Sequence, residues 1–436
     1  MLPEIRKMWQ TFRAHFSLAQ ILLALLVFTL LSSPVELRRS NKSNMEYFKL
    51  FVEPDSEELR STPIGPTSWH VKKTLDILKM WGKSGEEHTI TTEDGYILSL
   101  FRITPLKEKA TPVLFLHGLL AAPETWLIRG KEDLAIILNE EGYDVWLGCY
   151  RGSNYGRRHV NLTTANEKFW DFSFHEHGLY DAPAMIDHIY RETNQGMAVI
   201  AHSMGNAVFM SMLALRPEYN NMVYVFVGMA PYAVARFQFS PLVHTLLPGL
   251  VPLLRNINTN TLKYADLYTR RKLNPLVVVC AIARWTCLTT LQFSQGVDFK
   301  EIDWTYVLVL AAYFPSGTSN KNIVHIISIG NAQFRQYDYG TTGNLARYKS
   351  RTPPVYNLTN VRIPVSLYYG DNDMGVLVSG MKAQVKALPN VIKSTVVKGY
   401  NHPDFLLDKN SRRLLYNPIL EDLKTYNICR SKKSKE

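Results

Sequence analysis

The sequence predicts an α/β fold, with a mostly parallel sheet, helices on both of its faces and an inserted, mainly helical cap. Short apolar runs of strand length alternate with segments suited to helices through the first half of the chain. The alternation stops over residues 232–352, which are rich in long apolar side chains, and resumes near Ile363. A serine with a small residue two positions away on either side also stands between one strand and the helix after it.

The chain begins with a targeting segment, residues 1–33. Basic residues precede an uncharged apolar run at 16–31, and small residues follow that run. This pattern predicts a secretory signal peptide, and an uncleaved signal anchor is the alternative. Either one places the rest of the chain in the lumen or outside the cell. We therefore expect a secreted or lysosomal protein, with membrane anchoring through the N-terminus left open.

The body of the chain divides into two core parts around the cap. We expect a first core part at 34–231, the cap at 232–352, a second core part at 353–429 and a basic tail at 430–436. A hairpin is predicted around the Asp94-Gly95 pair. Strands are predicted at 112–116, 144–147, 197–201, 223–227, 364–369 and 394–397, and helices at 131–140, 181–191 and 207–215. An apolar cap over the carboxyl ends of the strands suits a water-excluded site, although a larger ordinary core would give the same composition.

Charge and composition exclude some functions. The net charge is +11, but residues 1–40 and 430–436 each contribute +3 (five basic and two acidic, four basic and one acidic). The body has no concentrated stripe of Lys and Arg, so we expect no nucleic-acid partner. Weak attraction to an anionic lipid surface and a plain solvated surface are both compatible with the remaining charge. The sequence does not indicate an oligomeric state.

Cysteines and glycosylation sequons agree with the secretory pathway. Disulfides are allowed there, and Cys280 and Cys287, which are close in sequence, are the candidate disulfide pair. Cys149 lies beside a predicted strand, where a buried small apolar residue is expected. Three Asn-x-Ser/Thr sequons are glycosylation candidates, at Asn41, Asn161 and Asn357.

The string AVIAHSMGN at residues 198–206 is typical of a nucleophile turn. Ser203 is flanked two positions away by Ala201 and Gly205, and small residues are needed where a strand and a helix pass close to the turn. Such a turn exposes the serine hydroxyl beyond the sheet edge. A buried serine in an ordinary strand-turn-helix is the alternative when the string is taken alone.

A serine nucleophile needs a base, and the base needs an orienting acid. Three histidines follow Ser203 in the chain: His244, His325 and His402. The first two lie in the apolar cap region, whereas His402 lies in a polar loop after the last predicted strand. Asp371 and Asp373 both end the preceding strand and both could hold the imidazole. Asp404 is expected to cap its own loop.

Backbone donors and the remaining candidates complete the site. Ester hydrolysis builds negative charge on the carbonyl oxygen, and backbone N–H groups can stabilise it. The amides of Met204 and Leu119 are the predicted donors, and His117 is expected to shape the loop before Leu119. The string His-Glu-His at 175–177 lacks a second ligand cluster, and no phosphate-binding Gly loop occurs, so we expect no metal and no cofactor.

Together these residues resemble the acid lipase family, which includes gastric and lysosomal acid lipases and belongs to the α/β-hydrolases. The resemblance covers nearly all of the chain after the signal. It rests on eight strings: LHGLL at 116–120, YDVWLG at 143–148, RG at 151–152, FWDFSFHE at 169–176, YDAPAMI at 180–186, HSMG at 202–205, ND at 372–373 and YNH at 400–402.

The resemblance implies a triad of Ser203, Asp373 and His402, a cap over the site and hydrolysis of lipid esters. It favours Asp373 over Asp371, because the Asn-Asp pair is the part that matches. It also places Cys287 on a family disulfide position and Asn357 on a family glycosylation site. The chain departs from the family pattern at four positions near the site: Ala201, Met204, Asp371 and Pro403.

We therefore expect a lipase, a serine carboxylic ester hydrolase that cleaves acylglycerols or sterol esters through an acyl-enzyme. Its partner would be a lipid ester at a micelle, droplet or membrane interface. Two alternatives stay open at this point: a catalytically silent lipase-like lipid carrier, and an esterase for small soluble esters.

Overall fold

The computed structural model describes residues 42–54, 69–233, 303–329 and 333–433. The predicted leader 1–33, the sequon at Asn41 and the cysteine pair Cys280 and Cys287 lie outside the described residues. Within the described residues, no helix combines the length and the apolar character needed to cross a bilayer.

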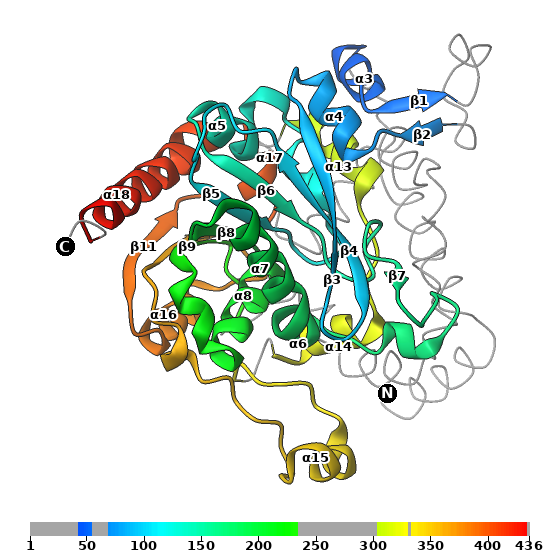
Figure 1. Cartoon of the computed structure of the whole chain (residues 1–436), viewed down its shortest axis with the longest axis vertical. Coiled ribbons are helices and arrows are strands. Elements are labelled where there is room, and N and C mark those ends of the chain that lie inside the picture. Colours follow the sequence, from blue (N-terminus) through cyan, green and yellow to red (C-terminus); the bar gives the residue numbers. More distant parts are fainter. Residues whose placement is uncertain (1–41, 55–68, 234–302, 330–332, 434–436) are drawn as a thin grey trace, which may run out of the picture.

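A nine-stranded sheet forms the centre of the described structure (Figure 1). Its order is β11-β10-β9-β8-β5-β6-β4-β3, with β7 paired to β4. The six strands from β11 to β6 run parallel, and β4, β3 and β7 join by antiparallel pairing. The strands are β3 Gly85–Thr91, β4 Tyr96–Ile103, β5 Pro112–Leu116, β6 Asp144–Gly148, β7 Arg158–His159, β8 Met197–His202, β9 Val223–Met229, β10 Val365–Gly370 and β11 Val391–Val397. A separate two-stranded sheet pairs β1 Val52–Pro54 with β2 Trp69–Val71.

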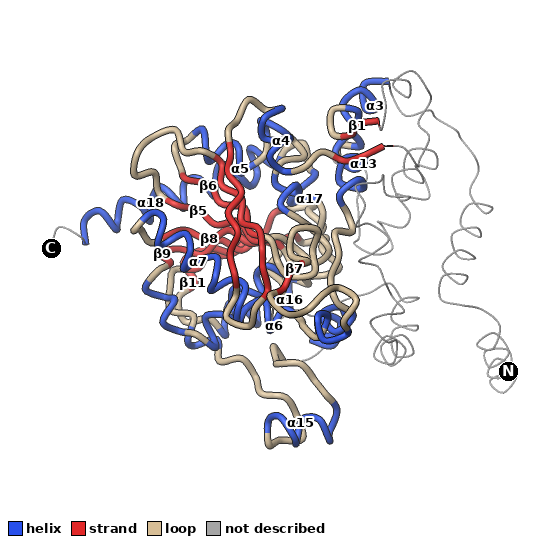
Figure 2. The backbone as a smooth tube through the Cα atoms, turned by 45° about the vertical axis from the view of Figure 1, so that its right-hand side comes forward, coloured by secondary structure: helices blue, strands red, loops and turns tan. Residues whose placement is uncertain are grey.

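Helices cover both faces of the large sheet (Figure 2). They are α3 Lys42–Lys49, α4 Thr74–Met80, α5 Leu134–Glu140, α6 Phe174–Glu176, α7 Ala182–Thr193, α8 Met204–Leu215, α13 Trp304–Tyr313, α14 Asn320–Ile329, α15 Gly340–Tyr348, α16 Val378–Ala387, α17 Asp404–Leu407 and α18 Asn417–Lys433. Helix α7 has a proline in its first turn, and Asn194, the residue after its last, takes a left-handed conformation (φ 49°). Both features are favourable at those two ends of a helix.

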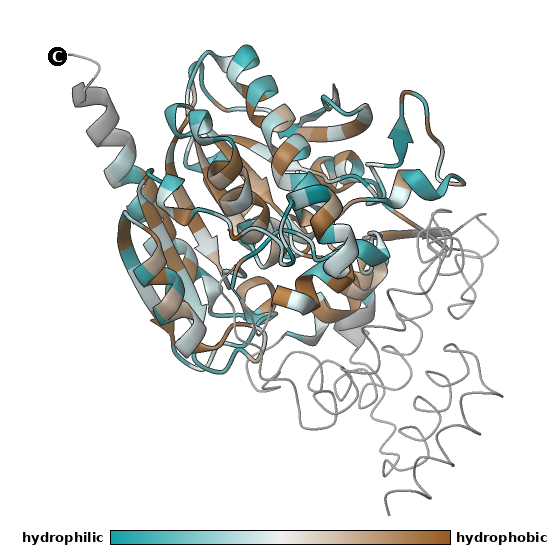
Figure 3. Cartoon of the chain, turned by 90° about the horizontal axis from the view of Figure 1, so that it is seen from below, coloured by the Kyte–Doolittle hydropathy of each residue, from teal (hydrophilic) through white to brown (hydrophobic). Residues whose placement is uncertain are grey.

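Successive side chains of the central strands belong alternately to two hydrophobic cores, one on each face of the sheet. In β5, Val113 and Phe115 join the core that includes α5, α13 and α17, whereas Leu114 and Leu116 join the core that includes α7 and α8. Every residue of β5 is buried, because both faces of a parallel sheet are covered. Apolar residues accordingly concentrate on the strands and inner helix faces (Figure 3).

The predicted fold class is confirmed, and each predicted strand lies within one observed strand or differs from it by a few residues at its ends. The hairpin around Gly95 is β3 paired with β4. Three described helices, α13, α14 and α15, fall within the range predicted for the cap. Helix α13 contributes Val307, Leu308 and Tyr313 to the core. The domain boundaries stay a prediction.

Candidate active site

Ser203 lies between β8 and α8, at the turn predicted to expose a nucleophile. Its backbone takes φ 54° and ψ −121°, a conformation that residues other than glycine rarely adopt. The following helix passes close to β5: a Cβ on Gly205 would lie 2.6 Å from the carbonyl oxygen of Leu116. The small residue at 205 is therefore required by this close approach, and the turn presents the serine at the carboxyl edge of the sheet.

His402 reaches Ser203 from the loop between β11 and α17. Its Nε2 lies 2.7 Å from the Ser203 hydroxyl oxygen. The end of β10 packs closely against this loop, because a Cβ on Gly370 would overlap the carbonyl oxygen of Tyr400. Asp404 caps the loop as expected, accepting a hydrogen bond from the backbone N–H of Asn401 at 2.7 Å.

Asp373 is the carboxylate beside the His402 ring. Its Oδ2 lies 2.9 Å from Nδ1 of His402, and its Oδ1 accepts the backbone N–H groups of Gly375 (2.7 Å) and Val376 (3.0 Å). The Asp373 side chain is fully buried. An ionised carboxylate only accepts, so Nδ1–H of His402 donates to Asp373 and Nε2 is free to accept from Ser203. Asp371 is exposed and instead accepts the backbone N–H of Gly399.

The two predicted backbone donors lie at the ends of β5 and β8. Within the described part of the chain, neither the Leu119 nor the Met204 backbone N–H donates a hydrogen bond. The loop of Leu119 is close to the serine, since a Cβ on Gly118 would lie 3.1 Å from Cβ of Ser203. Both amides are therefore available to a ligand, unlike an amide in the interior of a helix or strand.

His117 holds the Gly118 carbonyl rather than acting near Ser203. Its Nδ1–H donates to the Gly118 carbonyl oxygen at 2.9 Å, and its ring packs on Tyr150 with centroids 4.6 Å apart. Burial lowers the pKa of His117 to about 4, so the ring is neutral at ordinary pH. In a trans peptide the carbonyl and the next N–H point in opposite directions. Fixing the Gly118 carbonyl thus also fixes the direction of the Leu119 N–H.

His202, which the sequence reasoning did not single out, lies directly behind the His402 loop. Its Nε2–H donates to the His402 carbonyl oxygen at 3.3 Å, and the two rings lie 5.1 Å apart. Burial, and secondarily the charge of His402, lower the pKa of His202 to about 3. Its only signal in the sequence is its place immediately before Ser203.

Other predicted residues are held elsewhere. His325 lies in α14, where Nδ1 is 2.9 Å from the Ser173 hydroxyl and Nε2 is 3.0 Å from the Arg335 carbonyl. His244 lies outside the described residues. In the string 175–177 each side chain has its own protein partner: Tyr356 for His175, Ser173 and Lys321 for Glu176, and Asp181 for His177.

Cys149 is a free, fully buried thiol, as predicted. The sequon asparagines Asn161 and Asn357 are both exposed. The Asn357 side-chain oxygen also accepts from the backbone N–H and the hydroxyl of Thr359. Glycosylation at these two positions stays a prediction.

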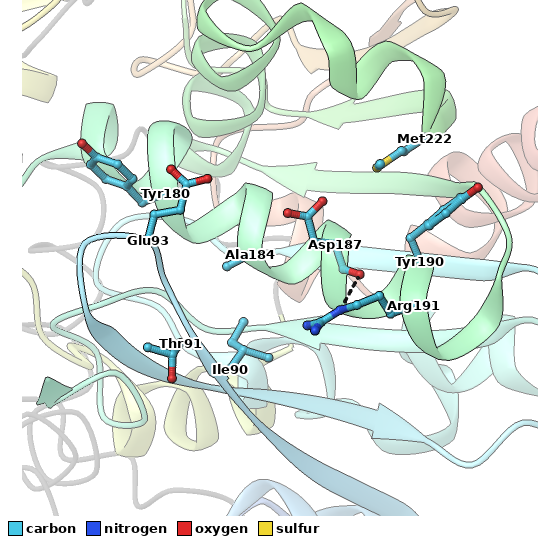
Figure 4. Close-up of a pocket in the computed structure, with 9 residues that line it drawn as sticks. All are labelled: Ile90, Thr91, Glu93, Tyr180, Ala184, Asp187, Tyr190, Arg191 and Met222. Carbon is cyan, nitrogen blue, oxygen red and sulfur yellow. Dashed lines mark hydrogen bonds between the residues drawn. The ribbon is translucent and has the colours of Figure 1, made fainter. Parts of the chain in front are cut away.

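A surface groove of about 460 Å³ lies between β3 and α7, on a part of the molecule that contributes none of the three site residues (Figure 4). The carboxylate of Asp187, one of the residues that line the groove, accepts a hydrogen bond from the Tyr219 hydroxyl at 2.9 Å. Its lining residues are Ile90, Thr91, Glu93, Tyr180, Ala184, Asp187, Tyr190, Arg191 and Met222.

Several known proteins that are similar to this chain in sequence are named lipases. A family model described as a partial alpha/beta-hydrolase lipase region matches residues 74–130. "Lipase 1" of Drosophila melanogaster is 33% identical over 362 residues, which cover 80% of each protein. "Gastric triacylglycerol lipase" of Bos taurus is 31% identical over 356 residues, 79% of this chain and 89% of that protein.

The human protein of the same name is 31% identical over 360 residues, 80% of this chain and 90% of that protein. Among solved structures, carboxylesterase CesB from Bacillus subtilis gives a TM-score of 0.47 at 12% identity, covering 88% of this chain and 99% of that one. On the extent and identity of its matches to the lipases, this chain belongs to the acid lipase family of α/β-hydrolases.

Proposed function

We propose that this protein is a lipase, a carboxylic ester hydrolase that cleaves lipid esters through a covalent acyl-enzyme on Ser203. The observation that supports it most is the series of hydrogen bonds from the Ser203 hydroxyl through His402 to Asp373, at 2.7 and 2.9 Å. This series supplies a nucleophile, a base and an orienting acid in the order that ester hydrolysis needs.

In the proposed reaction, His402 Nε2 takes the hydroxyl proton while Ser203 Oγ attacks the ester carbonyl carbon. The resulting oxyanion accepts hydrogen bonds from the N–H groups of Leu119 and Met204. The intermediate collapses, His402 returns the proton to the leaving alcohol, and an acyl-enzyme remains. Water then attacks the acyl carbon as His402 takes its proton, and the proton returns to Ser203 as the fatty acid leaves. Asp373 stabilises the imidazolium in both halves.

Acylglycerols or sterol esters are the proposed substrates. Family membership supports this class, and two of the similar proteins are named triacylglycerol lipases. These substrates gather at a micelle, droplet or membrane surface, which would be the working interface. The apolar leader and the sequons support a place in the secretory pathway, either secreted or lysosomal.

A fluorophosphonate probe tests the proposal, because it labels only an activated serine. We expect labelling of the wild-type protein and loss of both labelling and ester turnover in Ser203→Ala. Ser211→Ala is the matched control, since Ser211 is buried in α8, the helix that follows Ser203, and its hydroxyl donates to the Val208 carbonyl. A wild-type protein that takes no label would favour the silent lipid carrier.

A chain-length series of esters separates the lipase from an esterase for small soluble esters. We expect turnover to rise with acyl length and to rise further when the substrate forms an emulsion. Highest turnover on short, fully dissolved esters, with no gain at an interface, would instead favour the soluble-ester alternative.

A further inference from the structure

We propose that Asn206 is a positioning residue for the nucleophile, a role that rests on the proposed function of Ser203. Asn206 lies in the first turn of α8 and is completely buried. Its side-chain amide fastens the turn at Ser203 to the neighbouring strand β9, so that the serine hydroxyl stays aligned with His402.

The side-chain nitrogen of Asn206 faces three backbone carbonyl oxygens. Nδ2 lies 3.0 Å from the Ser203 oxygen, 3.1 Å from the Met229 oxygen and 3.3 Å from the Ala201 oxygen. These carbonyls come from the turn itself, from the end of β9 and from the end of β8. The amide therefore links the turn at Ser203 to the ends of both β8 and β9.

Two of these carbonyls also take part in the backbone hydrogen bonds of the nucleophile. The Met229 oxygen accepts the backbone N–H of Ser203 at 3.1 Å, and the Ser203 oxygen accepts the backbone N–H of Asn206 at 3.0 Å. Asn206 thus contacts two groups that fix the backbone of Ser203. One is the Ser203 carbonyl, and the other is the Met229 carbonyl, which accepts the Ser203 N–H. The contact with the Met229 carbonyl reaches beyond the helix to the end of β9.

The orientation of the amide is fixed by its surroundings. If Oδ1 and Nδ2 exchanged places, an oxygen acceptor would face three carbonyl oxygens. In the observed orientation Oδ1 is buried and has no partner in the described part of the chain. It lies beside Gly228, where an added Cβ would overlap it. Leaving a buried acceptor unpaired is costly, and the contacts of Nδ2 offset that cost.

The turn needs such support because its backbone is strained. Ser203 has φ 54°, and Ala230, which follows Met229, has φ 43°. Non-glycine residues persist in this region only where their surroundings hold them. Asn206 binds the carbonyl of Ser203 and the carbonyl of Met229, the residue before Ala230. Loss of the amide would free both to relax.

The test compares Asn206→Ala with Asn206→Thr by steady-state kinetics on a soluble ester, by fluorophosphonate inactivation rate and by thermal unfolding. We expect Asn206→Ala to lower kcat and the inactivation rate together, by about 10- to 100-fold, because small displacements of reacting groups have effects of that order. KM should stay within about 3-fold, since binding groups are untouched. The pH dependence of kcat should keep its midpoint, because His402 and Asp373 are unchanged.

Asn206→Thr supplies a hydroxyl that can donate to the carbonyl three or four residues earlier, and should recover part of the lost kcat. It also serves where Asn206→Ala fails to fold. Ser211→Ala, one to two turns further along α8, should lower the melting temperature but leave kcat near wild type. Wild-type kcat and inactivation rate in a folded Asn206→Ala would overturn the proposal, as would equal losses of kcat in Ser211→Ala. Labelling of the wild-type protein separates these outcomes from failure of the proposed function.

Discussion

The Ser203 hydroxyl oxygen lies 2.7 Å from Nε2 of His402, although 199 positions separate the two residues. The sheet brings them together, because β8, β9 and β10 are parallel neighbours and their carboxyl ends share one edge. Ser203 follows β8 directly, and the His402 loop is packed against the end of β10 at Gly370. The alignment of the nucleophile and its base is therefore a property of strand pairing as much as of the two side chains.

Asp373→Asn should lower kcat by about 10³- to 10⁴-fold with little change in the fold, because an amide holds the His402 ring less well and can favour the wrong tautomer. The measurement is kcat on a soluble ester, with thermal unfolding to check the fold. Asp371→Asn is the matched control, since its carboxylate accepts only from the exposed Gly399 turn among the described residues. Equal losses in both variants would contradict the assignment of the acid to Asp373.

Gly118→Ala should lower kcat by about 10- to 100-fold, because the added methyl must push neighbouring groups apart. It would lie 3.1 Å from Cβ of Ser203 and 3.2 Å from Nδ1 of His202. Steady-state kinetics on a soluble ester measure the effect. Gly340→Ala, at a positive-φ glycine with no atom within 4 Å of the new methyl, controls for backbone strain and should leave kcat unchanged. An active Gly118→Ala would show that the Leu119 loop lies further from the serine.

Stability against urea should fall as the pH drops from 6.5 towards 4, because three buried histidines resist protonation in the folded chain. Burial lowers the pKa of His117 to about 4, of His202 to about 3 and of His325 to about 3. Below pH 6.5 the unfolded chain takes up protons that the folded chain does not, so each histidine removes about 1 kcal/mol of stability per pH unit in this window. Asp133, whose pKa burial raises to about 7, acts in the opposite direction.

His325→Gln isolates one of these contributions. Glutamine keeps a donor and an acceptor near Ser173 and Arg335 but does not titrate. Urea unfolding at pH 6.5, 5.5 and 4.5 should show a pH slope smaller than wild type by about one proton. An unchanged slope would mean that His325 takes up its proton in the folded chain as easily as in the unfolded one.

Arg151→Met should lower the free energy of unfolding by about 3–5 kcal/mol, because it leaves the buried carboxylate of Asp181 without its cation. Arg151 and Asp181 are both buried, and Nε of Arg151 donates to Oδ1 of Asp181 at 2.7 Å. Urea unfolding is the measurement. Arg216→Met is the control: its bonds to Glu93 and Glu218 are exposed, so the loss should be below about 1 kcal/mol. Similar losses in both variants would contradict the argument from burial.

The central strands were predictable because buried parallel strands are continuous apolar runs, as in β5 and β8. The strand ends were less so. Strand β11 begins at Val391 rather than at 394, because it is an edge strand whose residues alternate in exposure and do not form an apolar run. Strand β10 begins at Val365 rather than at 364, since Pro364 has no N–H to join the ladder.

The candidate site was likewise predictable from the sequence only in part. Ser203 and His402 could be named from local strings and chain order. Asp371 and Asp373 could not be separated by residue chemistry, because both follow β10 and only the turn geometry directs one of them to His402. The contacts of His202 and Asn206 depend on backbone carbonyls that are distant in sequence, and no composition or spacing rule reports those.

Strands β9 and β10 hydrogen-bond side by side although residues 230–364 separate them along the chain. Ser203 precedes that excursion, and Asp373 and His402 follow it. The residues that pair in the ladder between these two strands all lie outside this stretch. An ancestral hydrolase with this topology could therefore acquire new substrate preferences by rewriting one continuous stretch, while its reaction chemistry was inherited intact.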